Sequence, residues 1–130
     1  MNNTEIKTNK NYNRIVDIVD SLIINPNPEA IDVLEEIGTN SSIDEVRELT
    51  AKALVKRNET KSLSIVISQK GKGINDMSTV VAMSTINCLL SLEDKQEAMK
   101  ILEETIASED LAEDVIENAR SVRALMNLSF

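Results

Sequence analysis

The sequence predicts an all-α fold, a short right-handed α-solenoid of about three helical hairpins that follow an N-terminal capping helix. Three observations favour it: Gly and Pro are scarce, at three and two in 130 residues; apolar residues recur every three or four positions from residue 12 onward; and one segment returns at a fixed spacing. A chain of this length forms one domain. We therefore expect a flexible tail at 1–11, which is polar and Asn-rich, and a single helical-repeat domain at 12–130.

The first three helices are bounded by capping signals. The first helix ends at the Asn-Pro-Asn-Pro run at 25–28, whose Asn27 can cap a second helix that Gly38 ends. Ser42, three residues before Glu45, forms the pattern of a capping box for a third helix. The faces expected to be buried are Ile15, Ile18, Val19 and Leu22, then Ala30, Val33, Leu34 and Ile37, and then Val46, Leu49, Thr50, Ala53 and Leu54.

Four further helices follow. A short helix around 63–67 leads to a Gly-Lys-Gly loop at 71–73, which lacks the Lys-Ser/Thr ending of a phosphate-binding loop and is interpreted as a helix-ending loop. Asp76 can cap a fifth helix over 77–92, and a second capping-box pattern stands at 110–113. The last two helices are expected to bury Ala98, Ile101, Leu102 and Thr105, and then Val115, Ala119, Val122 and Met126.

The chain repeats itself at a period near 34 residues. EAIDVLEE at 29–36, shifted by 68 positions, reaches EAMKILEE at 97–104, and five of the eight residues are identical. A shift of 34 places Val46 of the third helix on Val80, and a shift of 69 places it on Val115. Such a period indicates stacked helical hairpins, because each hairpin buries its apolar face only against its neighbours.

One segment also resembles a known family. Residues 44–54 read DEVRELTAKAL, and Asp44, Val46, Arg47, Ala53 and Leu54 carry the similarity to the second helix of HEAT-like repeats of the phycobilisome-lyase type. The resemblance covers about 29–127 but is specific only near 44–54, since Val81 and Ile116 replace the Arg in the other two copies. It implies an α-α superhelix whose second helices line a concave surface. An irregular helical bundle and a tetratricopeptide-like stack remain alternatives.

The composition excludes most catalytic chemistry. The sequence has no His and a single Cys, so it cannot build His-based acid–base or nucleophilic sites, ordinary zinc sites or an internal disulfide. We expect no enzymatic activity, no cofactor and no metal. The net charge of −8 argues against nucleic acid or a membrane surface as a partner. The N-terminus lacks the apolar stretch of a secretory signal, so we expect a cytoplasmic protein.

Two features predict a binding surface. Residues 52–72 carry six basic groups and one acidic group between acidic ends, although Lys and Arg also suit helix ends that bind nothing. The helix expected at 77–92 has no charge, so either its neighbours cover it or a partner does. The shift of 34 places three of its apolar residues where the third helix is charged. The predicted partner-binding residues are Lys52, Lys56, Ala82, Met83, Ile86 and Leu90.

These observations together predict a non-catalytic protein-binding module, a scaffold or adaptor whose concave face recognises a protein partner or another copy of itself. Cys88 aligns with Leu54 and is expected to be a buried apolar residue, since no His can activate its thiol. Two alternatives remain. The family resemblance implies an accessory protein of the bilin-lyase kind, which binds a tetrapyrrole or another small ligand. The acidic composition is also typical of a nucleic-acid mimic.

Overall fold

The computed structural model describes residues 3–39 and 41–128, and over these residues the protein is all-α, with seven α-helices, one short 3₁₀ helix and no strand. The expectation of an all-α chain with seven helices is confirmed. The helices are α1 (Asn3–Ile24), α2 (Glu29–Thr39), α3 (Asp44–Arg57), α4 (Thr60–Ser68), η1 (Ile74–Asp76, 3₁₀), α5 (Thr79–Leu90), α6 (Gln96–Ala107) and α7 (Glu113–Leu128).

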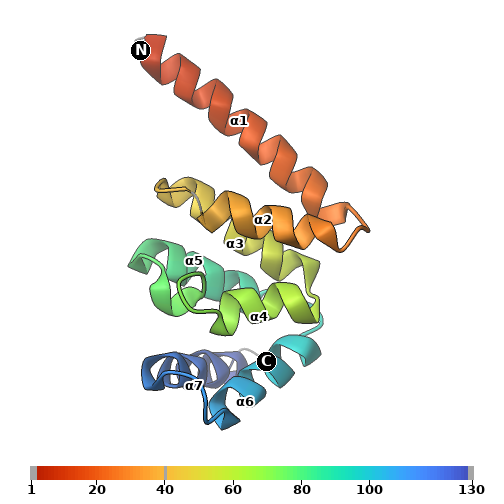
Figure 1. The fold of residues 1–130 in the computed structure, drawn as a ribbon, viewed down its shortest axis with the longest axis vertical. Coiled ribbons are helices and arrows are strands. Elements are labelled where there is room, and N and C mark those ends of the chain that lie inside the picture. The colour runs from red at the N-terminus through yellow and green to blue at the C-terminus, as the bar shows by residue number, and fades with distance from the viewer. Residues whose placement is uncertain (1–2, 40, 129–130) are drawn as a thin grey trace.

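The helices lie in successive layers along the long axis of the molecule (Figure 1). α1 lies at one end, followed by α2 with α3, then α4 with α5, and then α6 with α7. α3 is the centre of the packing, because it contacts α1, α2, α4 and α5. A single apolar core passes through the layers, from Val19 of α1 to Met126 of α7.

α3 and α5 lie side by side and run in the same direction. Three contacts join them, each between residues 34 or 36 positions apart: Ser78 Oγ to Asp44 Oδ2 at 3.1 Å, Ser84 Oγ to Glu48 Oε1 at 2.7 Å, and Cys88 Sγ to the Lys52 carbonyl oxygen at 3.8 Å. Because the residue numbers rise together on both sides, the two helices are parallel. α3 also contacts α5 more extensively than it contacts α4, the helix that follows it in the chain.

α1 is longer than the sequence predicts. It begins at Asn3 rather than at residue 12, so residues 3–11 of the expected tail are helical, and residues 1–2 lie outside the described residues. Nothing in the polar N-terminal composition signals this extension, but neither Gly nor Pro interrupts the helix. Val19 is buried as expected, whereas Ile18 is exposed.

Arg57, the last residue of α3, links the C-terminal end of α3 to the C-terminal end of α1. Its side chain is only 3% exposed, and Nη1 donates to the carbonyl oxygens of Leu22 at 2.7 Å and Asn25 at 2.6 Å. Nη2 forms an ion pair with Glu59 at 2.8 Å. Leu22 lies in the last turn of α1, where the carbonyls have no intrahelical donor, so Arg57 satisfies groups that would otherwise lack a partner.

Only one of the four expected helix starts is confirmed. Asn27 Oδ1 accepts from the Glu29 N–H at 3.0 Å, as a cap of α2 should. The expected box at Ser42 is wrong, because Ile43 occupies the N-cap position of α3 and makes no side-chain cap. The expected box at 110–113 is also wrong, because α7 begins only at Glu113.

The cap of α5 also differs from the expectation. Ser78, not Asp76, occupies the N-cap position, and its Oγ accepts from the Val81 N–H. Asp76 instead accepts from the Gly71 N–H at 2.7 Å and closes the loop after α4. Gly71 has a φ of 80°, which a glycine adopts without strain, and this segment is the expected helix-ending loop.

Gly38 has a different role from the one predicted. α2 continues through it to Thr39, so Gly38 does not end the helix. A Cβ at this position would lie 2.5 Å from Thr50 Oγ1 of α3, which is closer than non-bonded atoms approach. The missing side chain therefore allows α2 and α3 to pack closely.

The expected buried faces of α6 and α7 are confirmed residue for residue. In α4, which contains the short helix expected around 63–67, Leu63, Val66 and Ile67 are also buried. α2 differs, because Val33 is exposed and Ile31 is buried in its place. The apolar pattern of α2 is wide enough to suit either rotation of the helix, and packing against α1, α3 and α4 selects one.

Candidate functional site

The buried rows of α3 and α5 correspond at a shift of 35 residues, one more than the sequence repeat suggested. The corresponding buried pairs are Val46 and Val81, Thr50 and Thr85, and Leu54 and Leu89. The two threonines even form the same bond, since each hydroxyl donates to the carbonyl four residues earlier, at 3.1 and 2.7 Å. One residue turns a position by about 100° around a helix. The shift of 34 therefore paired outward positions of α5 with inward positions of α3.

Three predicted contact residues, Ala82, Ile86 and Leu90, lie on a flank of α5. They are half-buried and pack against the core. Ser84 and Cys88, on the opposite flank, face α3. The flank with Ala82, Ile86 and Leu90 thus turns toward α7, the other α-helix that α5 contacts. Partner binding by these three residues stays a prediction.

The side chains that point away from the core on α3 and α5 form what we call the outer face. The shift of 35 pairs its residues, which are Glu45, Glu48, Lys52 and Lys56 of α3 and Val80, Met83, Asn87 and Ser91 of α5. Val80 is 69% exposed and Met83 is 60% exposed. Of the predicted contact residues, Lys52, Lys56 and Met83 lie on this face. Val80 was missed because the shift of 34 placed it on buried Val46.

A shallow open depression separates α3 from α5 on the outer face. Its lining consists of Lys52, Lys56, Ser84, Asn87, Cys88 and Ser91. Cys88 is half-buried rather than buried as expected, because Leu89 and not Cys88 corresponds to Leu54. Desolvation raises the pKa of the Cys88 thiol, while the charges of Lys56 and Lys52 oppose that rise. The thiol is therefore not activated for nucleophilic attack.

Most other cations of the basic segment 52–72 are engaged in ion pairs. Lys72 Nζ lies 2.7 Å from Glu35 Oε2, and Lys61 pairs with Asp32, whose hydrogen bond raises the pKa of Lys61. Arg57 is bound as described above. On the outer face, Lys52 lies 3.9 Å from Glu48, a weak contact, and Lys56 makes no ion pair with another described residue. Two cations of this face are therefore available to a partner.

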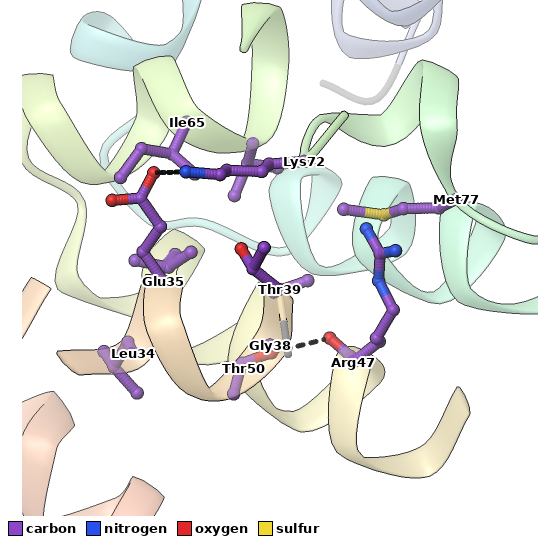
Figure 2. A pocket seen from close by; sticks show the side chains of 12 residues that line it. Leu34, Glu35, Gly38, Thr39, Arg47, Thr50, Ile65, Lys72 and Met77 are labelled. Carbon is purple, nitrogen blue, oxygen red and sulfur yellow. Dashed lines mark hydrogen bonds and ion pairs between the residues drawn. The ribbon is translucent and has the colours of Figure 1, made fainter. Parts of the chain in front are cut away.

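A small pocket lies between α2, α3, α4 and Met77 (Figure 2). Its apolar wall includes Leu34 and Ile65, and the ion pair of Glu35 with Lys72 stands at its edge. Arg47, the residue shared with HEAT-like repeats, extends toward Met77 in the same view. The cavity volume is about 20 Å³, which is room for about one water molecule. A tetrapyrrole does not fit this pocket.

Neither a search for metal and membrane-spanning features nor a comparison with known proteins assigns a function. Among the described residues, no three or more His, Cys, Asp or Glu side chains come together as a metal site, and no helix there has the length and apolar character needed to cross a membrane. No family model, curated protein or solved structure matches the chain.

Proposed function

We propose that this protein is a non-catalytic binding module, a scaffold or adaptor that recognises a protein partner through the outer face of α3 and α5. In this proposal the helix pairs form a short right-handed, HEAT-like α-solenoid, α1 caps its N-terminal end, and the outer face lies on its concave side. One observation carries the proposal: α5, which has no charged residue, exposes Val80 and Met83 on the outer face, and two available lysines of α3 lie toward the other end of the same face.

The packing pattern supports the solenoid. In an up-and-down helical bundle, helices that follow one another in the chain are the closest neighbours. Here α3 packs most closely on α2 and α5, and α4 packs on α6. Contact between every second helix, with parallel α3 and α5, is typical of stacked hairpins.

The chemistry of the outer face favours a protein as the ligand. An apolar centre with a charged rim is the usual anatomy of a protein contact. Val80 and Met83 supply the apolar centre, and Met adapts its shape to different partner surfaces. Lys52 and Lys56 supply part of the rim and favour a partner that presents carboxylates.

Affinity capture with matched variants tests the proposal. Met83→Glu places a charge in the apolar centre, and Val33→Glu makes the same kind of change at another exposed apolar position, on α2. We expect wild type and Val33→Glu to retain the same partner from a native extract, and Met83→Glu to retain it at least tenfold less. Equal capture by all three proteins would show that the outer face is not the binding surface.

A further inference from the structure

We infer that the outer face binds the outer face of a second copy of this chain, with α3 antiparallel on α3 and α5 antiparallel on α5 across a two-fold axis. This inference rests on the proposed function, because it names the occupant of the same face. The charges along α3 carry it, since their order is complementary to the same order reversed.

The charges of the outer face are sorted along α3. Glu45 and Glu48 lie toward its N-terminal end, and Lys52 and Lys56 lie toward its C-terminal end. The helix dipole favours this order. Within the helix, however, it places like charges three or four residues apart, which is unfavourable. A second α3 laid antiparallel gives each acid of the row a lysine and each lysine an acid.

One position of the axis serves both kinds of pair. The midpoint between Glu45 and Lys56 and the midpoint between Glu48 and Lys52 differ by half a residue, which is about 0.8 Å at the rise of an α-helix. Glu45 therefore meets Lys56 of the second copy in the same register in which Glu48 meets Lys52. The two-fold axis forms each of these pairs twice.

The direction of the axis follows from the charges. Two faces that meet in one plane are related by a two-fold axis lying in that plane. An axis along the helices would set them parallel, with Glu45 against Glu45, whereas an axis across the helices sets them antiparallel. Because α3 and α5 are parallel within one copy, the second axis also lays α5 antiparallel on α5. A solenoid turns by a small rotation from one repeat to the next, so these two adjacent helices form a nearly flat patch.

α5 contributes the uncharged part of the contact. The axis crosses α3 level with Thr50, and the shift of 35 residues therefore makes it cross α5 level with Thr85. Met83, which is 60% exposed, stands two residues from this crossing. The Met83 residues of the two copies are thus about 6 Å apart along the helix direction, and their long side chains reach each other. No charge on α5 opposes its own copy, because α5 has none.

The existing contacts leave the charges of α3 available. Glu45 and Lys56 are exposed, and neither makes an ion pair with another described residue. Glu48 accepts from Ser84 Oγ at 2.7 Å, but a carboxylate accepts several hydrogen bonds. Its ion pair with Lys52 is long, at 3.9 Å, and joins partly exposed side chains, so it is weak.

α7, the next helix along this face, adds no contact between like charges. It begins beside the segment that leads into α5, since Asn75 Nδ2 donates to Asp114 Oδ2 at 2.9 Å, and its first two buried residues follow those of α5 at a shift of 34. The same axis therefore sets Asp114 against Leu125 and Glu117 against Ser121 of the second copy. The net charge of −8 per copy opposes association, so the dimer depends on the local pairs of α3.

Charge exchange tests the inference by sedimentation equilibrium. One variant carries Lys52→Glu and Lys56→Glu, and the other carries Glu45→Lys and Glu48→Lys. Alone, each variant opposes like charges along α3, so we expect its dimer to weaken at least tenfold. Mixed in equal amounts, the two variants pair opposite charges at every position and together have the net charge of two wild-type copies. We expect the mixture to dimerise as wild type does.

A variant with all four of these substitutions tests the antiparallel direction at unchanged net charge. Its reversed row is still complementary to itself, but it opposes like charges to the wild-type row. We expect this variant to dimerise alone and a tagged wild type to retain at least tenfold less of it than of untagged wild type. Circular dichroism checks that each variant is folded. A folded but monomeric variant, or one that pairs equally well with wild type, would contradict the antiparallel contact.

Matched controls separate these effects from net charge. Lys70→Glu with Lys100→Glu, and Glu103→Lys with Glu104→Lys, change the net charge by the same amounts at exposed positions outside the outer face, and should leave the dimer intact. A monomeric wild type, or a mixture of folded variants that does not recover association, would overturn the inference. If a monomeric wild type still retains a partner from an extract and Met83→Glu does not, the proposed function stands without the dimer.

Discussion

α3 and α5 have corresponding buried rows but unlike outer rows. Both helices face the core with Val, Thr and Leu in the same order. Outward, α3 has four charged residues, while α5 has Val80, Met83, Asn87 and Ser91. The core restricts the inward residues of both helices in the same way, and solvent places no such restriction outward. The difference between the two helices therefore lies where a partner would make contact.

The largest loss of stability is expected from substitutions in the buried row of residues that α3 and α5 share. Leu54→Ala and Leu89→Ala each remove a fully packed side chain, and each should lower the free energy of unfolding by about 2–5 kcal/mol. Chemical denaturation measures both values. If Leu89→Ala costs less than about 1 kcal/mol while Leu54→Ala costs the full amount, α5 is not the counterpart of α3 in the core.

Thr50 and Thr85, the threonines of the two inward rows, contact different neighbours. Substituting each of them should therefore have a different influence on the stability lost in Gly38→Ala. Gly38→Ala brings a methyl group against Thr50 and should cost about 1–3 kcal/mol. The loss should shrink in a Thr50→Ala background, because the hydroxyl that the methyl meets is gone. Thr85 lies 3.6 Å from Met77 Sδ instead, so a Thr85→Ala background should leave the loss unchanged. Additive losses in both backgrounds would contradict close packing at Gly38.

Two substitutions within α5 should differ in their cost to stability, because one lies in the outer row and the other on the half-buried flank. Met83→Glu changes an exposed residue and should alter stability by about 0.5 kcal/mol or less. Ile86→Glu places a charge on a half-buried residue against the core and should cost more, about 1–2 kcal/mol. Thermal melts followed by circular dichroism compare the two. Equal losses would mean that α5 has no distinct outer row.

The smallest expected change in stability comes from ionisation of the Cys88 thiol. Its pKa is raised in the folded protein, so folding favours the protonated thiol. The resulting stabilisation is present below the pKa of the unfolded thiol and is lost as the pH rises through the folded pKa. Wild type should therefore lose slightly more stability than Cys88→Ser in alkaline solution. Lys52→Met with Lys56→Met should raise the thiol pKa further, as slower alkylation at fixed pH would show; faster alkylation would contradict this assignment.

The sequence predicted where the helices lie in the chain better than which side of each helix faces the core. Spaced apolar residues and scarce Gly and Pro were enough to find seven helices, and the faces of α6 and α7 were correct in full. The outer face was misplaced because the buried residues of α5 follow those of α3 at 35 residues and not at 34. The sequence repeat does not distinguish the two shifts, because both place apolar residues of α5 on the apolar row of α3.

Capping signals failed for a related reason. Ser42 and Glu45 have the right spacing for a capping box, yet the backbone enters α3 one residue later, at Ile43. Many positions in a chain rich in Ser, Asn and Asp satisfy the same local pattern, and tertiary packing selects among them. The structure instead places a capping box at Glu59 and Ser62 of α4, where the usual roles of the two residue types are exchanged.

The bonds of Arg57 have a consequence for proteolysis. The turn at 25–29 is exposed throughout and rich in Asn and Pro, the composition of a typical cleavage site. Its backbone is nevertheless fixed, because Arg57 binds the Asn25 carbonyl and the side chains of Asn25 and Asn27 bind the amides that follow. A protease must pull such a segment out of the fold before it can cut. The turn should therefore resist digestion in wild type and become the first site cleaved in Arg57→Met, which would release α1 from the remaining helices.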